Sequence, residues 1–373
     1  MKILVVNTVY GTGSTGRIAK AVAEEYAKPG DEIRYAYGRA DYVPDGLRGE
    51  AYRIGTSLGN RFHVFMTRFF DRHGTGVCSR WATKRFLRWA GEYAPDVLWL
   101  HNLHGYYINF ELLFNWIKAR PGMKVYWMLH DCWAFTGHCP HYTSTNCTQY
   151  QTECRNCPQR KDYPASFLFS NAKGNFRAKK RAFLGVSNLT LVIPSDWLAE
   201  QVRKGFLGDA YPVVIRRHTL DTRIFRPTPS DVRSRLGLKN GEKMVLCVAS
   251  QWDRKKGVQD VLALSRMIPS GWRIVMVGVT ARQLASLPKN VVGMTRMDSA
   301  QDLAELYSAA DWFFNPTHED IYSMTNMEAA ACGCRVISYD TGGAPEAVRG
   351  YDRAVLLSEH TAAAAVRVMT ATA

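Results

Sequence analysis

The chain has 373 residues, 46% of them hydrophobic and 22% charged, a composition typical of a folded protein large enough for two domains and not of a disordered one. No apolar run approaches the roughly 18 residues of a membrane span, and the chain begins with a strand-like run rather than a signal peptide, so we expect a cytoplasmic protein. The net charge of +15 could suit nucleic acid, but the basic residues alternate with aromatic ones and form no nucleic-acid motif, so nucleic acid is not an expected partner.

Short apolar runs rich in β-formers alternate with helical patterns along the chain, which predicts βαβ units and parallel sheets. Strands are predicted at residues 3–6, 33–37, 97–101, 125–130 and 189–193, and in a second series at 244–249, 274–277, 312–315 and 336–338. We therefore predict an α/β fold with two doubly wound, Rossmann-like domains facing a cleft, residues 1–215 and 216–373, joined through the segment 212–227.

A glycine-rich segment, Gly11-Thr-Gly13-Ser-Thr-Gly16-Arg17, follows the first predicted strand and precedes a helical pattern. Glycines let the backbone approach a ligand closely, and a helix start favours phosphate. A plain tight turn and a Rossmann dinucleotide site are the alternatives. The glycine order and the lack of an acid at the end of the strand near residue 38 count against the dinucleotide site.

Two later segments combine aromatic and basic residues at helical spacing. The first has Leu58, Phe62, Phe65, Met66 and Phe69 on one side and Arg61, Arg68 and Arg72 on the other, and the second has Trp81, Lys84, Arg85, Phe86, Arg88 and Trp89. Either the apolar residues face the core and the basic ones face water, or the segments form a surface that meets anionic lipid headgroups or a pyrophosphate-linked acceptor.

Two histidines, His101 and His130, end predicted strands, and Asp131 follows the second. The carboxyl ends of parallel strands line the ligand side of such sheets, so both histidines can reach a ligand, although a packed core histidine is the alternative.

A cysteine-rich loop at residues 138–158 contains Cys139, Cys147, Cys154 and Cys157. Four thiols that end in Cys-x-x-Cys predict a closed, structural zinc site, in which His138 or His141 could replace one thiol; disulfides and free thiols are the alternatives.

The second half contains a basic turn and a pair of carboxylates. Arg254-Lys255-Lys256-Gly257 follows the strand at 244–249, and Asp320 and Glu328 flank a predicted helix start after the strand at 312–315. A helix start can hold a diphosphate, and carboxylates on either side of it can accept hydrogen bonds from sugar and ribose hydroxyls. A basic surface turn and two solvated acids are the alternatives.

The segment from Asp320 through Glu328 to Ala-Cys-Gly333 and Gly342-Gly-Ala-Pro-Glu346 resembles the donor site of retaining glycosyltransferases of family four, and the glycine-rich segment is similar to that of members that make surface polysaccharides of the colanic-acid type. The resemblance implies the GT-B fold and catalytic roles for His130, Asp320 and Lys256. It implies donor contacts from Glu328, Glu319, Gly13, Gly16, Arg254, Tyr322, Ser323 and Met324, and acceptor contacts from Arg17, His101 and Asp131. It also implies a helix that crosses back to the first domain at the end of the chain, which we do not find in the sequence.

The expected function is therefore transfer of a sugar, with retention, from a UDP- or GDP-sugar to a hydroxyl of a saccharide or lipid-linked acceptor, without a catalytic metal. A lipid-linked acceptor would place the protein on the inner face of the plasma membrane. The alternatives are another GT-B enzyme of sugar nucleotides, such as an epimerase, and a non-enzymatic binder of an anionic polymer.

Overall fold

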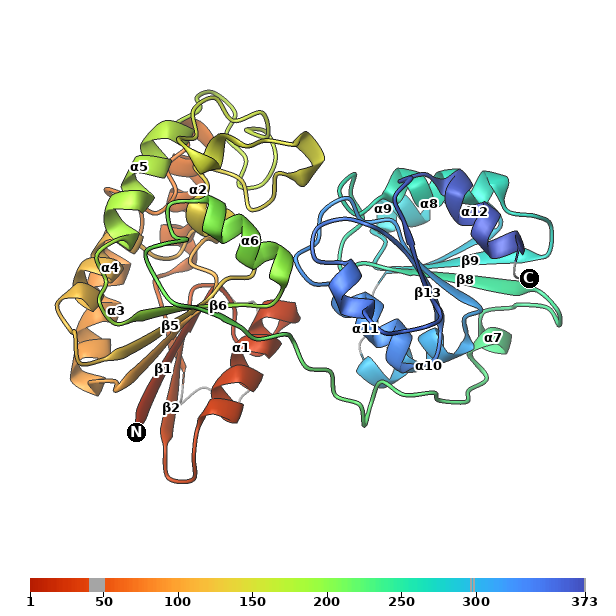
Figure 1. The fold of residues 1–373 in the computed structure, drawn as a ribbon, viewed down its shortest axis with the longest axis horizontal. Coiled ribbons are helices and arrows are strands. Elements are labelled where there is room, and N and C mark those ends of the chain that lie inside the picture. Colours follow the sequence, from red (N-terminus) through yellow and green to blue (C-terminus); the bar gives the residue numbers. More distant parts are fainter. Residues whose placement is uncertain (40–50, 296, 298, 372–373) are drawn as a thin grey trace. The chain divides into compact units, whose positions relative to one another are not determined.

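The computed structural model describes residues 1–39, 51–295, 297 and 299–371 (Figure 1). The chain divides into two compact units, Met1–Arg217 (unit 1) and His218–Ala373 (unit 2). The division falls two residues after the predicted domain boundary at residue 215.

Unit 1 is built on a seven-stranded parallel sheet with the order β3-β2-β1-β4-β5-β6-β7. Its strands are β1 (Lys2–Asn7), β2 (Glu32–Tyr37), β3 (Ala51–Arg53), β4 (Val97–Leu100), β5 (Lys124–Met128), β6 (Leu189–Ile193) and β7 (Val213–Ile215). Its α-helices are α1 (Gly13–Tyr26), α2 (Ser57–Phe70), α3 (Arg80–Tyr93), α4 (Phe110–Lys118), α5 (Ala172–Phe183) and α6 (Asp196–Lys204). The central strand β4 is buried at all four residues, as expected for a parallel strand covered on both faces.

Unit 2 repeats this plan with a six-stranded parallel sheet of order β10-β9-β8-β11-β12-β13. Its strands are β8 (Lys243–Val248), β9 (Trp272–Val277), β10 (Val291–Met294), β11 (Trp312–Asn315), β12 (Arg335–Tyr339) and β13 (Ala354–Leu357). Its α-helices are α7 (Val232–Arg235), α8 (Val258–Met267), α9 (Ala281–Leu284), α10 (Ala300–Ala309), α11 (Met324–Ala331) and α12 (Ala362–Ala371). Helix α12 packs in the same apolar cluster as α8, so it belongs to the core of unit 2.

Each sheet reverses its strand order once, between β1 and β4 in unit 1 and between β8 and β11 in unit 2. In doubly wound sheets ligands bind outside the carboxyl ends of the strands at this reversal, because the loops there diverge to opposite faces. The loops after β1, β4, β8 and β11 are therefore where ligand-binding residues are expected.

The nine predicted strands are confirmed, and the four that the sequence analysis missed are β3, β7, β10 and β13. All four are edge strands. These edge strands have three or four residues each, and none of them is buried throughout.

The aromatic side of α2 faces outward, contrary to the interpretation that it packs on the core. Leu58 is 75% exposed and Phe62 48% exposed, whereas the buried residues of this helix are His63 and Thr67. In α3, Trp81 is 80% exposed while Phe86 is buried. The apolar side chains of α2 therefore lie at the surface together with its arginines.

Candidate active site

The loops that follow β8 and β11 meet at the strand-order reversal of unit 2. Gly257 ends the first loop with a positive φ of 74°, and a Cβ atom there would lie 2.2 Å from the carbonyl oxygen of Pro316 in the second. His318 N–H also donates to the carbonyl oxygen of Lys255 at 2.8 Å. The backbones of the two loops are thus in direct contact, which places the basic turn beside the carboxylates.

Two lysines of the first loop pair with two carboxylates of the second. Lys255 Nζ lies 2.9 Å from Glu319 Oε2, and Lys256 Nζ lies 3.3 Å from Asp320 Oδ2. The Glu319 side chain is only 3% exposed, whereas those of Lys256 and Asp320 are 39% and 16% exposed. Of the two neighbouring acids, Asp320 is therefore the one that a ligand can reach more easily.

The loop that carries Asp320 is fixed by its own backbone. The N–H of Tyr322 donates to Asp320 Oδ1 at 3.2 Å, and the N–H of Gly343 donates to the Asp320 carbonyl oxygen at 3.1 Å. Gly342 has φ of +56°, and a Cβ atom there would lie 2.0 Å from the same carbonyl oxygen. Close approach at Gly342 therefore sets the position of Asp320.

Helix α11 begins after Ser323, whose hydroxyl accepts a bond from the N–H of Asn326 at 3.4 Å. Glu328 lies one turn further on, is 8% exposed, and accepts a bond from the Tyr307 hydroxyl at 3.0 Å. Burial, together with the Glu328 carboxylate, raises the pKa of Tyr307 well above its usual range, so this phenol stays protonated and keeps donating. Met324 is half-buried at the first helical position.

The remaining residues near this site differ in exposure. Arg254 is exposed and Tyr322 is buried, with its ring 5.8 Å from that of His218. The sequence analysis did not predict that His318 contacts Asp260 at 3.0 Å, or that the Tyr339 hydroxyl donates to the other oxygen of Asp260 at 2.9 Å. No sequence signal links these three residues, because they come from three separate elements.

In unit 1 the loop formed by the glycine-rich segment is shorter than predicted. Helix α1 already begins at Gly13, so the second half of the segment is helical. Gly11 and Gly13 both have φ of 63°. Gly16 lies in the first turns of the helix, where a Cβ atom would be 3.2 Å from Gly11 N, so it lets the helix start pack on the loop after β1. Arg17 is exposed on the same part of the helix.

His101 and His130 follow neighbouring parallel strands and contact each other, with His101 Nδ1 2.9 Å from His130 Nε2. The Trp127 indole N–H donates to the His101 carbonyl oxygen at 3.1 Å. His101 is 1% exposed, whereas His130 is partly exposed. The geometry suits His130 for ligand contact and His101 for holding the His130 ring.

A second pair beside them was missed by the sequence analysis. His104 Nε2 lies 2.7 Å from Asp131 Oδ2, and His104 Nδ1 lies 3.1 Å from the Tyr163 hydroxyl. Burial opposes ionisation of Asp131, but His104 and the Trp133 N–H outweigh it and lower the pKa of this carboxyl. His104 follows His101 by three residues, and this spacing was the only available signal.

The four cysteines of the loop at 138–158 are free thiols that lie near one another. Cys139 and Cys157 share a hydrogen bond, which raises the pKa of Cys139 and lowers that of Cys157 to about 7. Cys154 Sγ accepts a bond from the Gly137 N–H at 3.2 Å, and burial, with a smaller effect from Cys147, raises the pKa of Cys154 to about 11. Among the described residues, however, the four sulfurs do not form a group in which every ligand atom lies within 4.8 Å of the others.

The fold and the strand-order reversals define two doubly wound, parallel-sheet α/β units, and comparison with known proteins shows what they resemble. Residues 242–371, most of unit 2, match the family model described as "Glycosyl transferases group 1". D-inositol 3-phosphate glycosyltransferase of Mycobacterium ulcerans (strain Agy99) is 28% identical over 183 residues, 46% of this chain and 39% of that protein. The matched region thus spans about two fifths of the length of that relative.

Solved structures resemble the chain over nearly its whole length. Sucrose-phosphate synthase from Thermosynechococcus elongatus has a TM-score of 0.67 with 16% identity, covering 99% of this chain and 89% of that one. Anabaena Alr3699/HepE, solved in complex with UDP-glucose, has a TM-score of 0.65 with 15% identity, covering 100% and 89%. This likeness confirms the predicted fold, two parallel-sheet α/β domains as in GT-B glycosyltransferases. None of the helices in the described parts of the chain is long and apolar enough to cross a membrane.

Proposed function

We propose that this protein is a retaining glycosyltransferase that moves a sugar from a UDP- or GDP-sugar to a hydroxyl of a saccharide or lipid-linked acceptor. The observation that carries the proposal is the cluster of Lys255, Lys256, Glu319 and Asp320 at the strand-order reversal of unit 2. It lies within the residues that match the glycosyl transferase family model. The UDP-glucose in the solved Anabaena protein supports the donor class.

Charge explains how unit 2 would act on the donor. A departing nucleoside diphosphate gains negative charge in the transition state, and Lys256, Arg254 and the start of α11 near Ser323 offer positive charge to stabilise it. Lys256 already pairs with Asp320. The diphosphate would therefore contact Lys256 while the donor sugar contacts the neighbouring Asp320. Asp320 would bind the sugar hydroxyls, and the buried Glu328 would accept a bond from the ribose, as the resemblance implies.

Unit 1 would supply the acceptor side. His130 has the partly exposed ring of the two paired histidines, so we assign it to orienting the reacting sugar and the acceptor, with His101 holding its ring. Arg17 and the pair of His104 and Asp131 would contact the acceptor. The acceptor hydroxyl would attack the sugar from the same face from which the diphosphate leaves. The leaving phosphate oxygen would take the proton of that hydroxyl, so the reaction would need no additional base.

We also propose that unit 1 binds an anionic membrane surface. The outward-facing Leu58, Phe62 and Trp81 can enter the headgroup layer while the arginines of α2 pair with lipid phosphates. Each basic residue near such a surface contributes about 1 kcal/mol. A lipid-linked acceptor would account for this surface.

We also propose that the cysteine-rich loop binds a structural zinc.

The test is a panel of nucleotide sugars measured by thermal shift, followed by product analysis with saccharide and lipid-linked acceptors, since a bound donor raises apparent stability. Glu328→Gln should weaken binding of both the donor and the free nucleoside diphosphate, because a charge-assisted bond of about 1.5–3 kcal/mol becomes neutral. Asp320→Asn should lower turnover while free nucleoside diphosphate still binds. Turnover of a nucleotide sugar without any acceptor would instead indicate an epimerase, and no response to any nucleotide sugar would refute the proposal.

A further inference from the structure

The segment before α5 carries three consecutive apolar side chains that face solvent, and we call these residues the apolar loop. Phe167, Leu168 and Phe169 are 53%, 58% and 59% exposed. At the end of α2, Phe69 and Phe70 are 36% and 45% exposed. Single exposed apolar residues are ordinary in soluble proteins, but a contiguous exposed patch marks a surface that a partner covers.

Hydrogen bonds hold the apolar loop on the last turn of α2. The N–H of Phe167 donates to the carbonyl oxygen of Arg68 at 2.7 Å. The hydroxyl oxygen of Ser166, a buried residue, lies 2.7 Å from the carbonyl oxygen of Phe169 and 3.4 Å from that of Arg68. Because these bonds fix the backbone, the three apolar side chains stay at the surface, next to the exposed aromatic residues that end α2.

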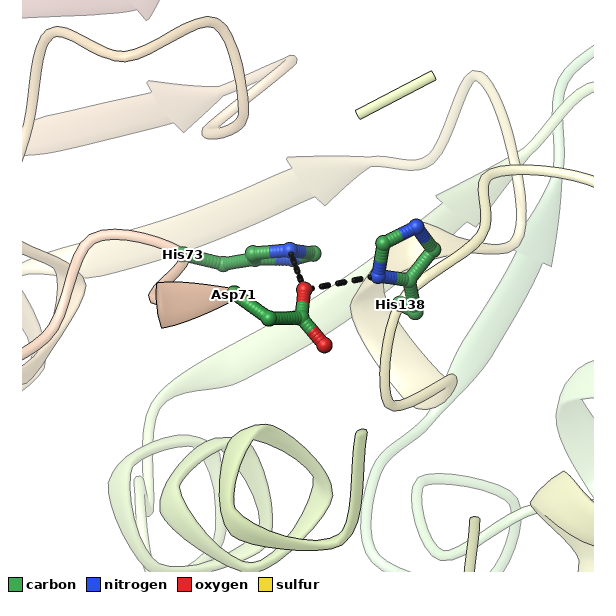
Figure 2. A group of neighbouring side chains, drawn as sticks. All are labelled: Asp71, His73 and His138. Carbon is green, nitrogen blue, oxygen red and sulfur yellow. Dashed lines mark hydrogen bonds and ion pairs between the residues drawn. The ribbon is translucent and has the colours of Figure 1, made fainter. Parts of the chain in front are cut away.

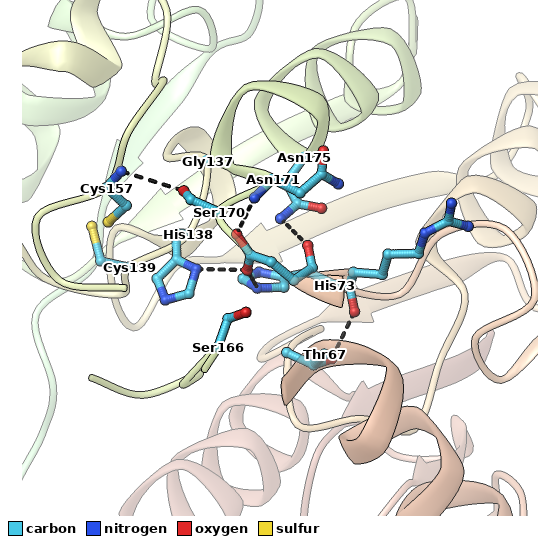
Figure 3. Close-up of polar contacts among 12 residues, drawn as sticks. Thr67, His73, Gly137, His138, Cys139, Cys157, Ser166, Ser170, Asn171 and Asn175 are labelled. Carbon is cyan, nitrogen blue, oxygen red and sulfur yellow. Dashed lines mark hydrogen bonds and ion pairs between the residues drawn. The ribbon is translucent and has the colours of Figure 1, made fainter. Parts of the chain in front are cut away.

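A buried carboxylate holds the other end of the apolar loop. Asp71, the residue that follows α2, accepts a bond at Oδ2 from the N–H of Asn171 at 2.7 Å, and its carbonyl oxygen accepts a bond from the Asn175 side chain at 2.6 Å (Figure 3). Asp71 Oδ1 accepts bonds from His73 Nε2 at 2.7 Å and His138 Nδ1 at 2.8 Å, and Figure 2 shows both rings directed at this oxygen. The Asp71 side chain is 0% exposed, so water does not compete for these bonds. The apolar loop is therefore fixed to α2 on both sides.

The charges beside the apolar loop favour an anionic lipid surface as its partner. Helix α2 contains Arg61 and Arg68 and no acidic residue, Arg72 follows its end, and all three arginines are exposed. The guanidinium of Arg68 lies 5.8 Å from the ring of Phe167. Apolar side chains next to basic ones are typical of surfaces that enter the headgroup layer of anionic membranes. A second copy of the chain fits less well, since a symmetric dimer would bring the same arginines together.

We propose that Phe167, Leu168 and Phe169 insert at the boundary between the headgroups and the acyl chains of an anionic membrane, while the arginines beside them pair with lipid phosphates. This inference rests on the membrane binding proposed above, and it adds the element that enters the bilayer. Insertion is favourable because it removes the apolar surface of the three side chains from water. Binding would therefore have an apolar part from the apolar loop and an electrostatic part from the arginines, and salt would screen only the second.

The apolar loop lies close in the chain to a residue beside the proposed acceptor contacts. Tyr163, whose hydroxyl lies 3.1 Å from His104 Nδ1, precedes Phe167 by four residues. Four residues span at most about 14 Å. His104 in turn pairs with Asp131, and both are proposed above to contact the acceptor. Insertion of the apolar loop would therefore bring these acceptor contacts close to the headgroup layer, where the sugar of a lipid-linked acceptor lies.

The test measures how the full-length chain sediments with two kinds of vesicle, phosphatidylcholine alone and phosphatidylcholine mixed with phosphatidylglycerol. Wild-type protein should bind the mixed vesicles at low salt and ignore the neutral ones. Leu168→Gln should weaken partitioning into the mixed vesicles by at least about tenfold, because it removes a leucine side chain from the acyl boundary. Leu356→Gln is the matched control, since Leu356 is 40% exposed in unit 2, and it should partition like wild type.

Equal partitioning of Leu168→Gln and wild type would overturn the proposal, because the arginines alone would then account for binding. Wild-type protein that does not bind the mixed vesicles would also overturn it, and a dimer that Leu168→Gln loses in analytical ultracentrifugation would assign the apolar loop to a second copy. Phe169→Gln repeats the test if Leu168→Gln does not fold. Vesicle binding that depends on Leu168, without a response to any nucleotide sugar, would refute the proposed glycosyl transfer and leave this inference standing.

Discussion

Gly342 controls the position of the proposed sugar-binding carboxylate, and Gly342→Ala tests that role. A Cβ atom at Gly342 would lie 2.0 Å from the Asp320 carbonyl oxygen, against 3.4 Å or more for an ordinary contact. The oxygen must therefore move by more than about 1 Å, and a misplacement of about 1 Å in a catalytic site can cost about 100-fold in rate. The positive φ of 56° adds about 1–2 kcal/mol of backbone strain for alanine.

Gly350→Ala is the matched control, because Gly350 also has a positive φ, +80°, but a Cβ atom there would meet nothing within 4 Å. Both variants should lose about 1–2 kcal/mol of stability through backbone strain. Only Gly342→Ala should also lose turnover, by about 100-fold, with the donor that the thermal-shift panel identifies. Equal turnover of the two variants would refute the argument that close packing at Gly342 sets the position of Asp320.

Other predictions concern charge at three places. Lys256→Met should weaken binding of free nucleoside diphosphate by calorimetry, whereas Lys239→Met, an exposed lysine of unit 2, should not. Replacing Arg61, Arg68 and Arg72 with Gln should weaken low-salt pelleting with anionic liposomes and leave donor binding intact; wild-type protein that ignores anionic liposomes would contradict the membrane proposal. Burial lowers the pKa of His63 to about 3, so the unfolded state binds more protons below about pH 6.5 and stability falls as pH falls through that window. In urea titrations, the free energy of unfolding of both proteins is measured at pH 7.5 and at pH 5. The decrease between these two pH values should be about 2 kcal/mol smaller for His63→Gln than for wild type. An equal decrease in both proteins would show that His63 does not titrate this way.

The sequence by itself determined the two parallel sheets, because strands covered on both faces must be continuously apolar and such runs can be read without coordinates. It also predicted that the two segments proposed to bind the donor lie together, since Lys256 and Asp320 each follow such a strand and parallel strands bring their carboxyl ends to one edge. The edge strands escaped prediction because they are short: β7 and β13 are apolar throughout but have only three and four residues, and β10 contains Gly293.

Only the tertiary structure decided contacts between residues distant in sequence. Sequence spacing could not show that Glu319 is buried against Lys255 while Asp320 remains accessible, since the two acids are adjacent and chemically alike. Nor could it show which side of α2 faces the core, because the buried residues are His63 and Thr67 and the apolar ones are exposed. Helical periodicity separates two faces of a helix, but which face is buried depends on what packs against it.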